Sequence, residues 1–199
     1  MDTAHARRYP PRSCTGLTAR MTENPFKSNY VLRQLVSLGS ASTMVEVILK
    51  MLGHSQFFDD FTMDDIAKLS EFMEVYRAEP GQTIIREGDL DDYMLFILQG
   101  RISIVKTDGN GERRAMTSVG PGATLGEMSM IDGEPRFATC IAIDTTTFAV
   151  FGRDSMVKII MDEPALGAKI LIKLVTLLSQ RLRETSVSLL QHLERSNTV

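Results

Sequence analysis

Between Glu74 and Gly152 the chain is a succession of short apolar stretches separated by tight turns, and this pattern limits the possible folds most strongly. The clearest turn is the run Asp108-Gly109-Asn110-Gly111, because Asp-Gly and Asn-Gly pairs tolerate the positive φ angles of a β-hairpin. We predict strands over residues 83–86, 93–98, 102–107, 112–119, 137–143 and 146–151. Many short antiparallel strands joined by glycine-rich turns indicate a β-roll, a jelly-roll-like barrel.

Helical patterns lie on both sides of these strands. We expect helices over residues 43–53, 63–73, 154–161 and 164–195. Ser42 is a candidate cap for the first, and Thr62 with Asp65 resembles a capping box for the second. The fold class is therefore α+β: an antiparallel β-roll over about residues 74–152, with N-terminal helices and a long C-terminal helix, the C-terminal helices occupying about residues 154–195.

The N-terminal part and the overall composition bound the domain count and the cellular setting. Residues 1–40 are polar and irregular, so we expect a flexible extension there and one domain over residues 41–199. The net charge of -3 argues against a DNA-binding surface, and no apolar run reaches the roughly 18 residues of a membrane helix. Cys14 and Cys140 form no metal-ligand pattern. We expect a cytoplasmic protein that binds neither DNA nor a membrane.

The segment GPGATLGEMSMIDGEPR, residues 120–136, interrupts the strand pattern and carries the chemistry. A short helix beginning after Gly126 would present the backbone N–H groups of its first turn, those of Glu127, Met128 and Ser129, to an anion. Arg136 can direct a planar guanidinium at the same anion, and Glu127 can accept hydrogen bonds from sugar hydroxyls. The combination fits a ribose cyclic phosphate. On the residues alone, a structural ion pair between Arg136 and Glu127 is an equal alternative.

The stretch GEMSMIDGEPRFAT resembles the phosphate-binding cassette of cyclic-nucleotide-binding domains, and REGDLDDYMLFILQGRISIVK resembles the central strands of that family. The resemblance covers about residues 55–195. It implies a cyclic nucleotide as ligand, expected to be cAMP, and no other cofactor, with Glu127 on the ribose 2′-hydroxyl and Arg136 on the phosphate. The ligand-binding positions that it implies are Gly126, Glu127, Met128, Ser129, Arg136, Phe137 and Ala138.

Phe137 departs from the family pattern, which has a small residue after the cassette arginine. Three readings stay open. The ring turns away or stacks on a base; the pocket binds a different nucleotide, such as cyclic di-GMP; or the ring blocks the pocket and the domain is a dimeric scaffold that binds no nucleotide.

The long C-terminal helix carries an apolar seam with heptad spacing, formed by Leu171, Val175, Leu178, Leu182, Thr185 and Leu189. This spacing predicts a homodimer through paired helices, whereas a helix folded back on its own sheet is the alternative. The run Arg181-Leu182-Arg183-Glu184-Thr185-Ser186 resembles a stretch of the catabolite activator proteins in which Thr and Ser meet the adenine at the dimer interface. The resemblance therefore implies Thr185 and Ser186 as further ligand contacts.

These observations favour a stand-alone sensor that signals to another, unidentified protein through its C-terminal helix. We expect no enzyme, because no nucleophile lies in a pattern with a general base. A DNA-binding regulator is disfavoured: catabolite activator proteins carry a winged DNA-binding domain after this helix, and here the sequence ends at Val199.

Overall fold

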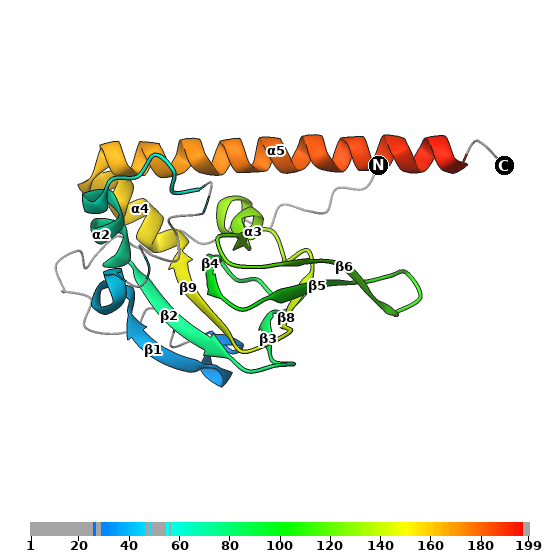
Figure 1. Cartoon of the computed structure of the whole chain (residues 1–199), viewed down its shortest axis with the longest axis horizontal. Coiled ribbons are helices and arrows are strands. Elements are labelled where there is room, and N and C mark those ends of the chain that lie inside the picture. The colour runs from blue at the N-terminus through cyan, green and yellow to red at the C-terminus, as the bar shows by residue number, and fades with distance from the viewer. Residues whose placement is uncertain (1–25, 27–28, 47, 49–54, 56, 197–199) are drawn as a thin grey trace, which may run out of the picture.

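The computed structural model describes residues 26, 29–46, 48, 55 and 57–196, and within them the strands form two antiparallel sheets. One sheet has the strand order β1-β2-β9-β4-β7 and the other β3-β8-β5-β6, which together make the β-roll (Figure 1). The strands are β1 (Val36–Ser40), β2 (Met73–Ala78), β3 (Thr83–Ile85), β4 (Tyr93–Gln99), β5 (Ile102–Thr107), β6 (Arg113–Val119), β7 (Thr124–Leu125), β8 (Thr139–Ala142) and β9 (Thr146–Gly152). The predicted fold class is confirmed.

The helices gather on one side of the five-stranded sheet. They are α2 (Met63–Ser70), α3 (Glu127–Asp132), α4 (Arg153–Asp162) and α5 (Pro164–Ser196). Of the two 3-10 turns, η2 (Ala41–Met44) lies on the same side, whereas η1 (Leu32–Gln34) buries Leu32 in the core between the two sheets. The capping box predicted at Thr62 is confirmed: the Asp65 N–H donates to Thr62 Oγ1 at 3.1 Å, and the Thr62 N–H donates to Asp65 Oδ2 at 2.9 Å. The predicted helix 63–73 ends early, because Met73 begins β2.

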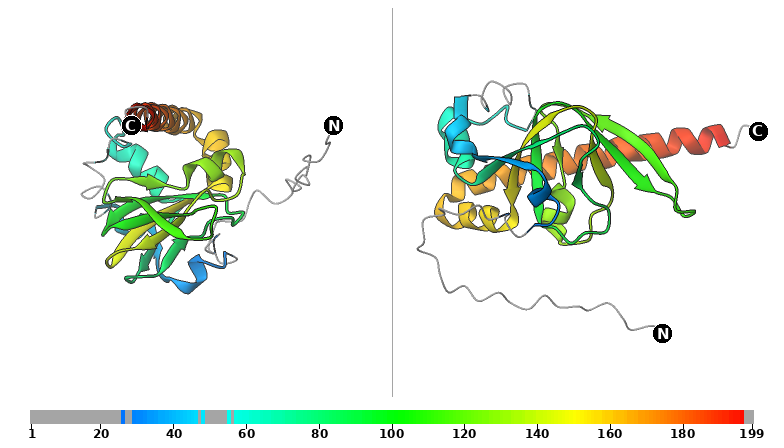
Figure 2. Two further views of the ribbon diagram at one scale, coloured as in Figure 1. Left: turned by 90° about the vertical axis from the view of Figure 1, so that its right-hand side faces the viewer. Right: turned by 90° about the horizontal axis from the view of Figure 1, so that it is seen from below.

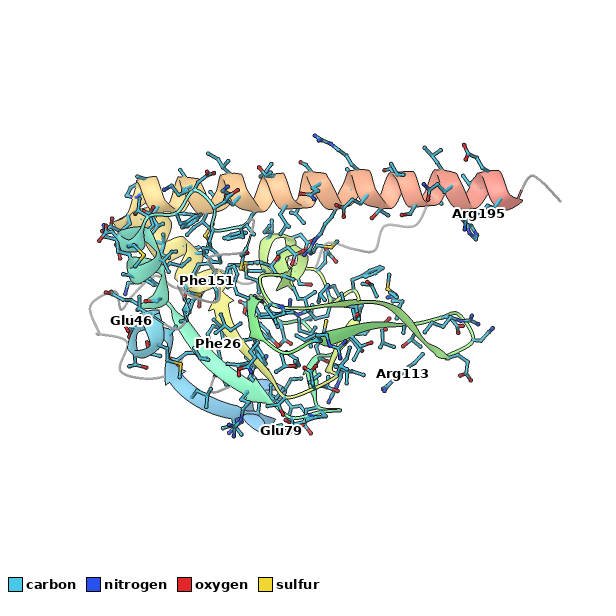
Figure 3. The ribbon with its side chains drawn as sticks, in the orientation of Figure 1. Phe26, Glu46, Glu79, Arg113, Phe151 and Arg195 are labelled. Carbon is cyan, nitrogen blue, oxygen red and sulfur yellow. The ribbon has the colours of Figure 1, made fainter. Side chains whose placement is uncertain are left out.

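Strand β4 explains why the core has two parts. Residues 93–98 are all buried, because alternate side chains of a strand point to opposite faces and both faces of this strand are covered. Leu95 and Ile97 belong to the cluster between the two sheets. Phe96 belongs to the cluster on the helical side, which also contains Phe151 and residues of α2, α4 and α5. Figure 3 shows Phe151 close to α4 on this side.

The N-terminal part departs from the sequence prediction. Leu32 and Leu35 are buried in the cluster between the sheets, and β1 pairs with β2 from Val36 to Ser40. The expectation of a flexible extension up to residue 40 is therefore wrong for residues 29–40, which are held by the burial of Leu32 and Leu35 and by the pairing of β1 with β2. Residues 1–25 lie outside the described part. Most of the predicted helix 43–53 lies outside it too, and η2 is capped by Ser40 instead of Ser42.

Helix α5 has a packed half and an exposed half. Leu166, Ile170 and Leu174 are buried in the helical-side cluster, which anchors the N-terminal half. Figures 1 and 2 show that the helix continues past the β-roll, and Figure 3 places Arg195 near its far end. Leu182 and Leu189 of the predicted seam are exposed there. The alternative of a helix folded back on its own domain therefore describes the first half of α5, but it does not explain the exposed leucines of the second half.

Candidate functional site

Helix α3 lies between β4 and the middle of α5, as Figure 1 shows. It begins after Gly126 and ends before Gly133, and both glycines have positive φ angles, of 82° and 77°. Two features require glycine at position 126. One is its positive φ, and the other is the lack of space, because a Cβ there would lie 2.6 Å from Arg136 Nη1 and 2.9 Å from the Tyr93 carbonyl oxygen. Arg153 caps the other end of the helix, where its Nε donates to the Met130 carbonyl at 2.6 Å.

Arg136 is buried behind the start of α3, with only 3% of its surface exposed. Its Nη1 donates to the Gly126 carbonyl at 2.9 Å and its Nη2 to the Tyr93 carbonyl at 2.6 Å. The guanidinium also lies over the Tyr93 ring, 4.3 Å from the ring centroid. A guanidinium carries five N–H donors, so these two bonds leave several for another acceptor. Among the described residues, the buried Nε has no hydrogen-bond partner.

Asp91 connects this arginine to the N-terminal part of the chain. Its Oδ1 accepts a hydrogen bond of 2.6 Å from Asn29 Nδ2, and its buried Oδ2 has no partner within the described part. Burial raises the pKa of the Asp91 carboxyl, and the nearby positive charge of Arg136 opposes this shift. A residue preceding β1 thus contacts the loop that leads into β4 and the Arg136 environment.

Glu127 pairs with a residue that the sequence analysis did not single out. Its carboxylate is 2% exposed, and its Oε1 accepts a hydrogen bond from Arg181 Nη1 of α5. Arg181 Nη2 also donates to the Thr124 carbonyl at 2.7 Å. The second carboxylate oxygen, Oε2, is buried and has no partner in the described chain. The alternative of an ion pair between Arg136 and Glu127 is therefore not what the structure has, since Glu127 pairs with Arg181.

These side chains line one pocket. Its walls are formed by Ile85, Ile104, Leu125, Gly126, Glu127, Met128, Ser129, Arg136, Phe137, Ala138, Cys140 and Arg181. The structure thus brings together the seven cassette positions named from the sequence, residues 126–129 and 136–138. Burial raises the pKa of the Cys140 thiol to about 12, so this wall of the pocket carries a protonated thiol at neutral pH.

Thr185 and Ser186, also named from the sequence, do not join the pocket. Both side chains are exposed, and their hydroxyls donate to carbonyls of their own helix, that of Thr185 to Arg181 and that of Ser186 to Leu182, each at 2.8 Å. Arg181 lies one helical turn before Thr185 and points to the cassette instead. Arg181 belongs to the run that carried the resemblance to catabolite activator proteins. The signal that could have singled it out is the expected burial of Glu127, because a buried carboxylate needs a cation close to it.

The described residues also bear on metal binding and on membrane insertion. They contain no group of three or more His, Cys, Asp or Glu side chains placed to hold a metal ion. No helix among them is both long and apolar enough to cross a membrane.

Comparisons with known proteins point to one family. A family model for the cyclic nucleotide-binding domain matches residues 76–163. A crystal structure of a cyclic nucleotide-binding domain from Methylobacillus flagellatus KT is 37% identical, with a TM-score of 0.74, and the match covers 84% of this chain and 94% of that one. Nearly the whole of that domain is thus similar to this chain.

Two curated relatives are longer. The cyclic AMP receptor protein of Thermus thermophilus is 29% identical over 109 residues, which cover 55% of this chain and 49% of the relative. A CRP-like cAMP-activated global transcriptional regulator of Mycobacterium tuberculosis is 26% identical over 140 residues, which cover 70% of this chain and 61% of the relative. The chain therefore matches about half to three fifths of the length of these relatives.

Proposed function

This chain belongs to the cyclic nucleotide-binding domain family, and on that premise we propose that its pocket binds a cyclic nucleotide, with cAMP as the first candidate. The choice of cAMP rests on the two curated relatives, whose names refer to cyclic AMP. The protein acts as a sensor without chemistry of its own. The protonated Cys140 thiol in the pocket wall is consistent with this role.

One observation carries the proposal: two buried polar atoms of opposite character, Arg136 Nε and Glu127 Oε2, have no partner in the described chain and belong to residues that line the same pocket. A buried donor or acceptor without a partner is costly, so a ligand that satisfies both is favoured. A ribose cyclic phosphate offers both groups: its phosphate accepts from Arg136, and its 2′-hydroxyl donates to Glu127.

The same carboxylate provides a route for the signal. Glu127 Oε1 is bonded to Arg181, whereas Oε2 is the oxygen assigned to the ribose. The ligand and α5 therefore meet on the two oxygens of one side chain. A ligand that orders Glu127 also strengthens the contact between α3 and α5. The strength of this contact then differs between the ligand-free and the ligand-bound chain, and this difference shifts the position of α5.

The exposed heptad seam of α5, which begins in the packed half of the helix and continues through its exposed half, is the proposed output surface. Val175, Leu182 and Leu189 of the heptad seam are all more than half exposed, at 63%, 69% and 58%. We propose that a second copy covers them in a parallel dimer, because paired heptad seams bury such residues. In that assembly the exposed Thr185 and Ser186 lie on the dimer face, where they are available to a ligand of either protomer. The downstream partner reads the angle or exposure of the paired helices.

Isothermal titration calorimetry with cAMP, cGMP and cyclic di-GMP tests the proposal. We expect saturable binding of cAMP with one ligand per chain. Arg136→Ala is expected to weaken it by about 2–4 kcal/mol through loss of charge-assisted contacts. Arg114→Ala is the matched control, because Arg114 is an exposed arginine on β6 outside the pocket lining. Absence of heat with all three ligands would contradict the proposal and favour the dimeric scaffold.

A further inference from the structure

One aromatic side chain stands at the rim of the pocket and is not needed for the core. Phe137 is 57% exposed, and it is the aromatic residue among the described residues that line the pocket. By contrast, Phe96, Phe148 and Phe151 are almost fully buried. A single exposed apolar side chain is ordinary on a protein surface, but Phe137 lines the pocket together with Arg136 and Glu127, so its ring is placed to contact a molecule bound there.

The Phe137 ring is positioned by the ion pair of Lys106 and Glu87, which we call its brace. Lys106 Nζ of β5 lies 4.4 Å from the centroid of the Phe137 ring and donates to the Phe137 carbonyl at 2.6 Å. The same ammonium pairs with Glu87 Oε1 at 2.7 Å, and Glu87 Oε2 accepts from the Thr107 N–H at 3.0 Å. Two of the three N–H donors of Lys106 are thus used by Glu87 and by the Phe137 carbonyl, and the positive charge of the ammonium interacts with the Phe137 ring.

This arrangement determines what the ring is available for. An ammonium over a phenyl ring occupies one face only, and because Phe137 is 57% exposed and lines the pocket, the ring can offer its other face to a planar group. Both the backbone and the ring of Phe137 are tied to Lys106, and the neighbouring residue in the chain is Arg136, which is assigned to the phosphate. A base attached to a ribose cyclic phosphate at Arg136 is therefore within reach of the Phe137 ring.

We propose that Phe137, braced by Lys106 and Glu87, is the platform on which the base of the cyclic nucleotide stacks, and that it makes the site selective for purines over pyrimidines. This inference rests on the proposed function. A phenyl ring carries no hydrogen-bonding atoms, so it distinguishes bases by stacking area and not by their polar edges. Adenine and guanine are therefore held about equally by Phe137, and cytosine or uracil less well.

Titrations of the full chain with cAMP, cGMP, cCMP and cUMP test this platform. We expect the two purine ligands to bind the wild type with affinities within about threefold of each other, and about tenfold or more above the pyrimidine ligands. Phe137→Leu keeps an apolar side chain but removes the aromatic face, so it should weaken cAMP about 10-fold and abolish the preference for purines. Lys106→Met should weaken cAMP by a smaller factor, because the ring keeps its stacking face but loses its brace.

A second readout separates stacking from general packing. In NMR spectra of bound cAMP, the adenine H2 and H8 signals should move upfield in the wild type and lose that shift in Phe137→Leu. Met116→Leu is the control, because Met116 is similarly exposed at 56% but lies on β6 outside the pocket lining. Unchanged purine preference in Phe137→Leu, or tighter cAMP binding, would overturn the platform while leaving the proposed function intact. A wild type that binds none of the four ligands would overturn both.

Discussion

Arg181 in the middle of α5 pairs with Glu127 at the first position of α3, and this ion pair connects the C-terminal helix to the wall of the candidate pocket. The two residues are 54 positions apart in the chain. Glu127 is 2% exposed, whereas Arg181 retains 37% exposure, so the carboxylate depends on the arginine more than the arginine depends on it. Burial also lowers the pKa of the Arg181 guanidinium, although an arginine stays charged at neutral pH.

Removal of Arg181 should therefore destabilise the domain. Arg181→Ala leaves the buried Glu127 carboxylate without its cation, and we expect a loss of about 1–3 kcal/mol in the free energy of unfolding, discounted for the partial exposure of Arg181. Urea denaturation measures this loss. Arg183→Ala is the matched control, because Arg183 lies on the same helix and is exposed. Equal stability of the two variants would show that the ion pair does not hold α5.

Gly126→Ala tests the close approach at the start of α3. Gly126 and Gly111 have nearly the same positive φ, 82° and 83°, but a Cβ at Gly126 would meet Arg136 and Tyr93, whereas a Cβ at Gly111 meets nothing within 4 Å. Both alanine variants therefore carry the backbone strain, roughly 1–3 kcal/mol, and only Gly126→Ala carries the steric clash. We expect Gly126→Ala to lower the melting temperature well below that of Gly111→Ala and to abolish cAMP binding. Similar melting temperatures would contradict the geometry at Arg136.

Asp91→Asn should show a pH-dependent gain in stability. Burial raises the folded-state pKa of Asp91 above the ordinary value of 3.8, so folding takes up a proton between those two values. Stability attributable to this group is then present at low pH and is lost as the pH rises through the folded pKa. The groups that bear on it are Asn29, Arg136, Asp89 and Asp92.

The variant removes the unfavourable buried charge, so it should be more stable than the wild type at pH 7, and the difference should shrink as the pH falls towards 4. Urea denaturation at several pH values measures this. A variant that is less stable at pH 7 would instead show that the charge of Asp91 is needed to hold Arg136.

Much of the β-roll was predictable because its determinants are local. The Asp-Gly-Asn-Gly turn joins β5 to β6, and the capping box begins α2, as the residue types at those positions require. Strand β1 was missed because its residues, VSLGS, are exposed or half-buried and show no clear alternation of buried and exposed side chains, so its strand conformation depends on pairing with β2. Strand β7 has only two residues, too few for any periodic pattern.

The site shows the same division between local and long-range information. The cassette positions line the pocket because they belong to one short stretch of chain around α3. Arg181 was missed because only the tertiary packing of α5 brings it to Glu127. Thr185 and Ser186 came from the resemblance to a dimeric protein, and a single chain leaves both exposed. Their predicted role therefore depends on the proposed dimer.

The dimer is tested by lysine substitutions on the exposed half of α5. Leu182→Lys combined with Leu189→Lys places charges in the seam without touching the buried Leu166, Ile170 and Leu174. Each buried leucine contributes roughly 1.5–3 kcal/mol, so the double variant should be a folded monomer where the wild type sediments as a dimer at micromolar concentration. Thr176→Lys, an exposed position outside the seam, is the control. A double variant that remains dimeric would place the interface elsewhere.

The most direct test of the account is the discrimination between cAMP and 2′-deoxy-cAMP by calorimetric titration of the wild type and Glu127→Gln. The two ligands differ by the hydroxyl that we assign to Glu127 Oε2. A hydrogen bond to a charged group contributes about 1.5–3 kcal/mol, so the wild type should prefer cAMP by about 10-fold to 150-fold. Glu127→Gln should lose most of that preference. Equal affinities of the wild type for both ligands, or no binding of either, would contradict the assignment of this pocket to a cyclic nucleotide held through Glu127.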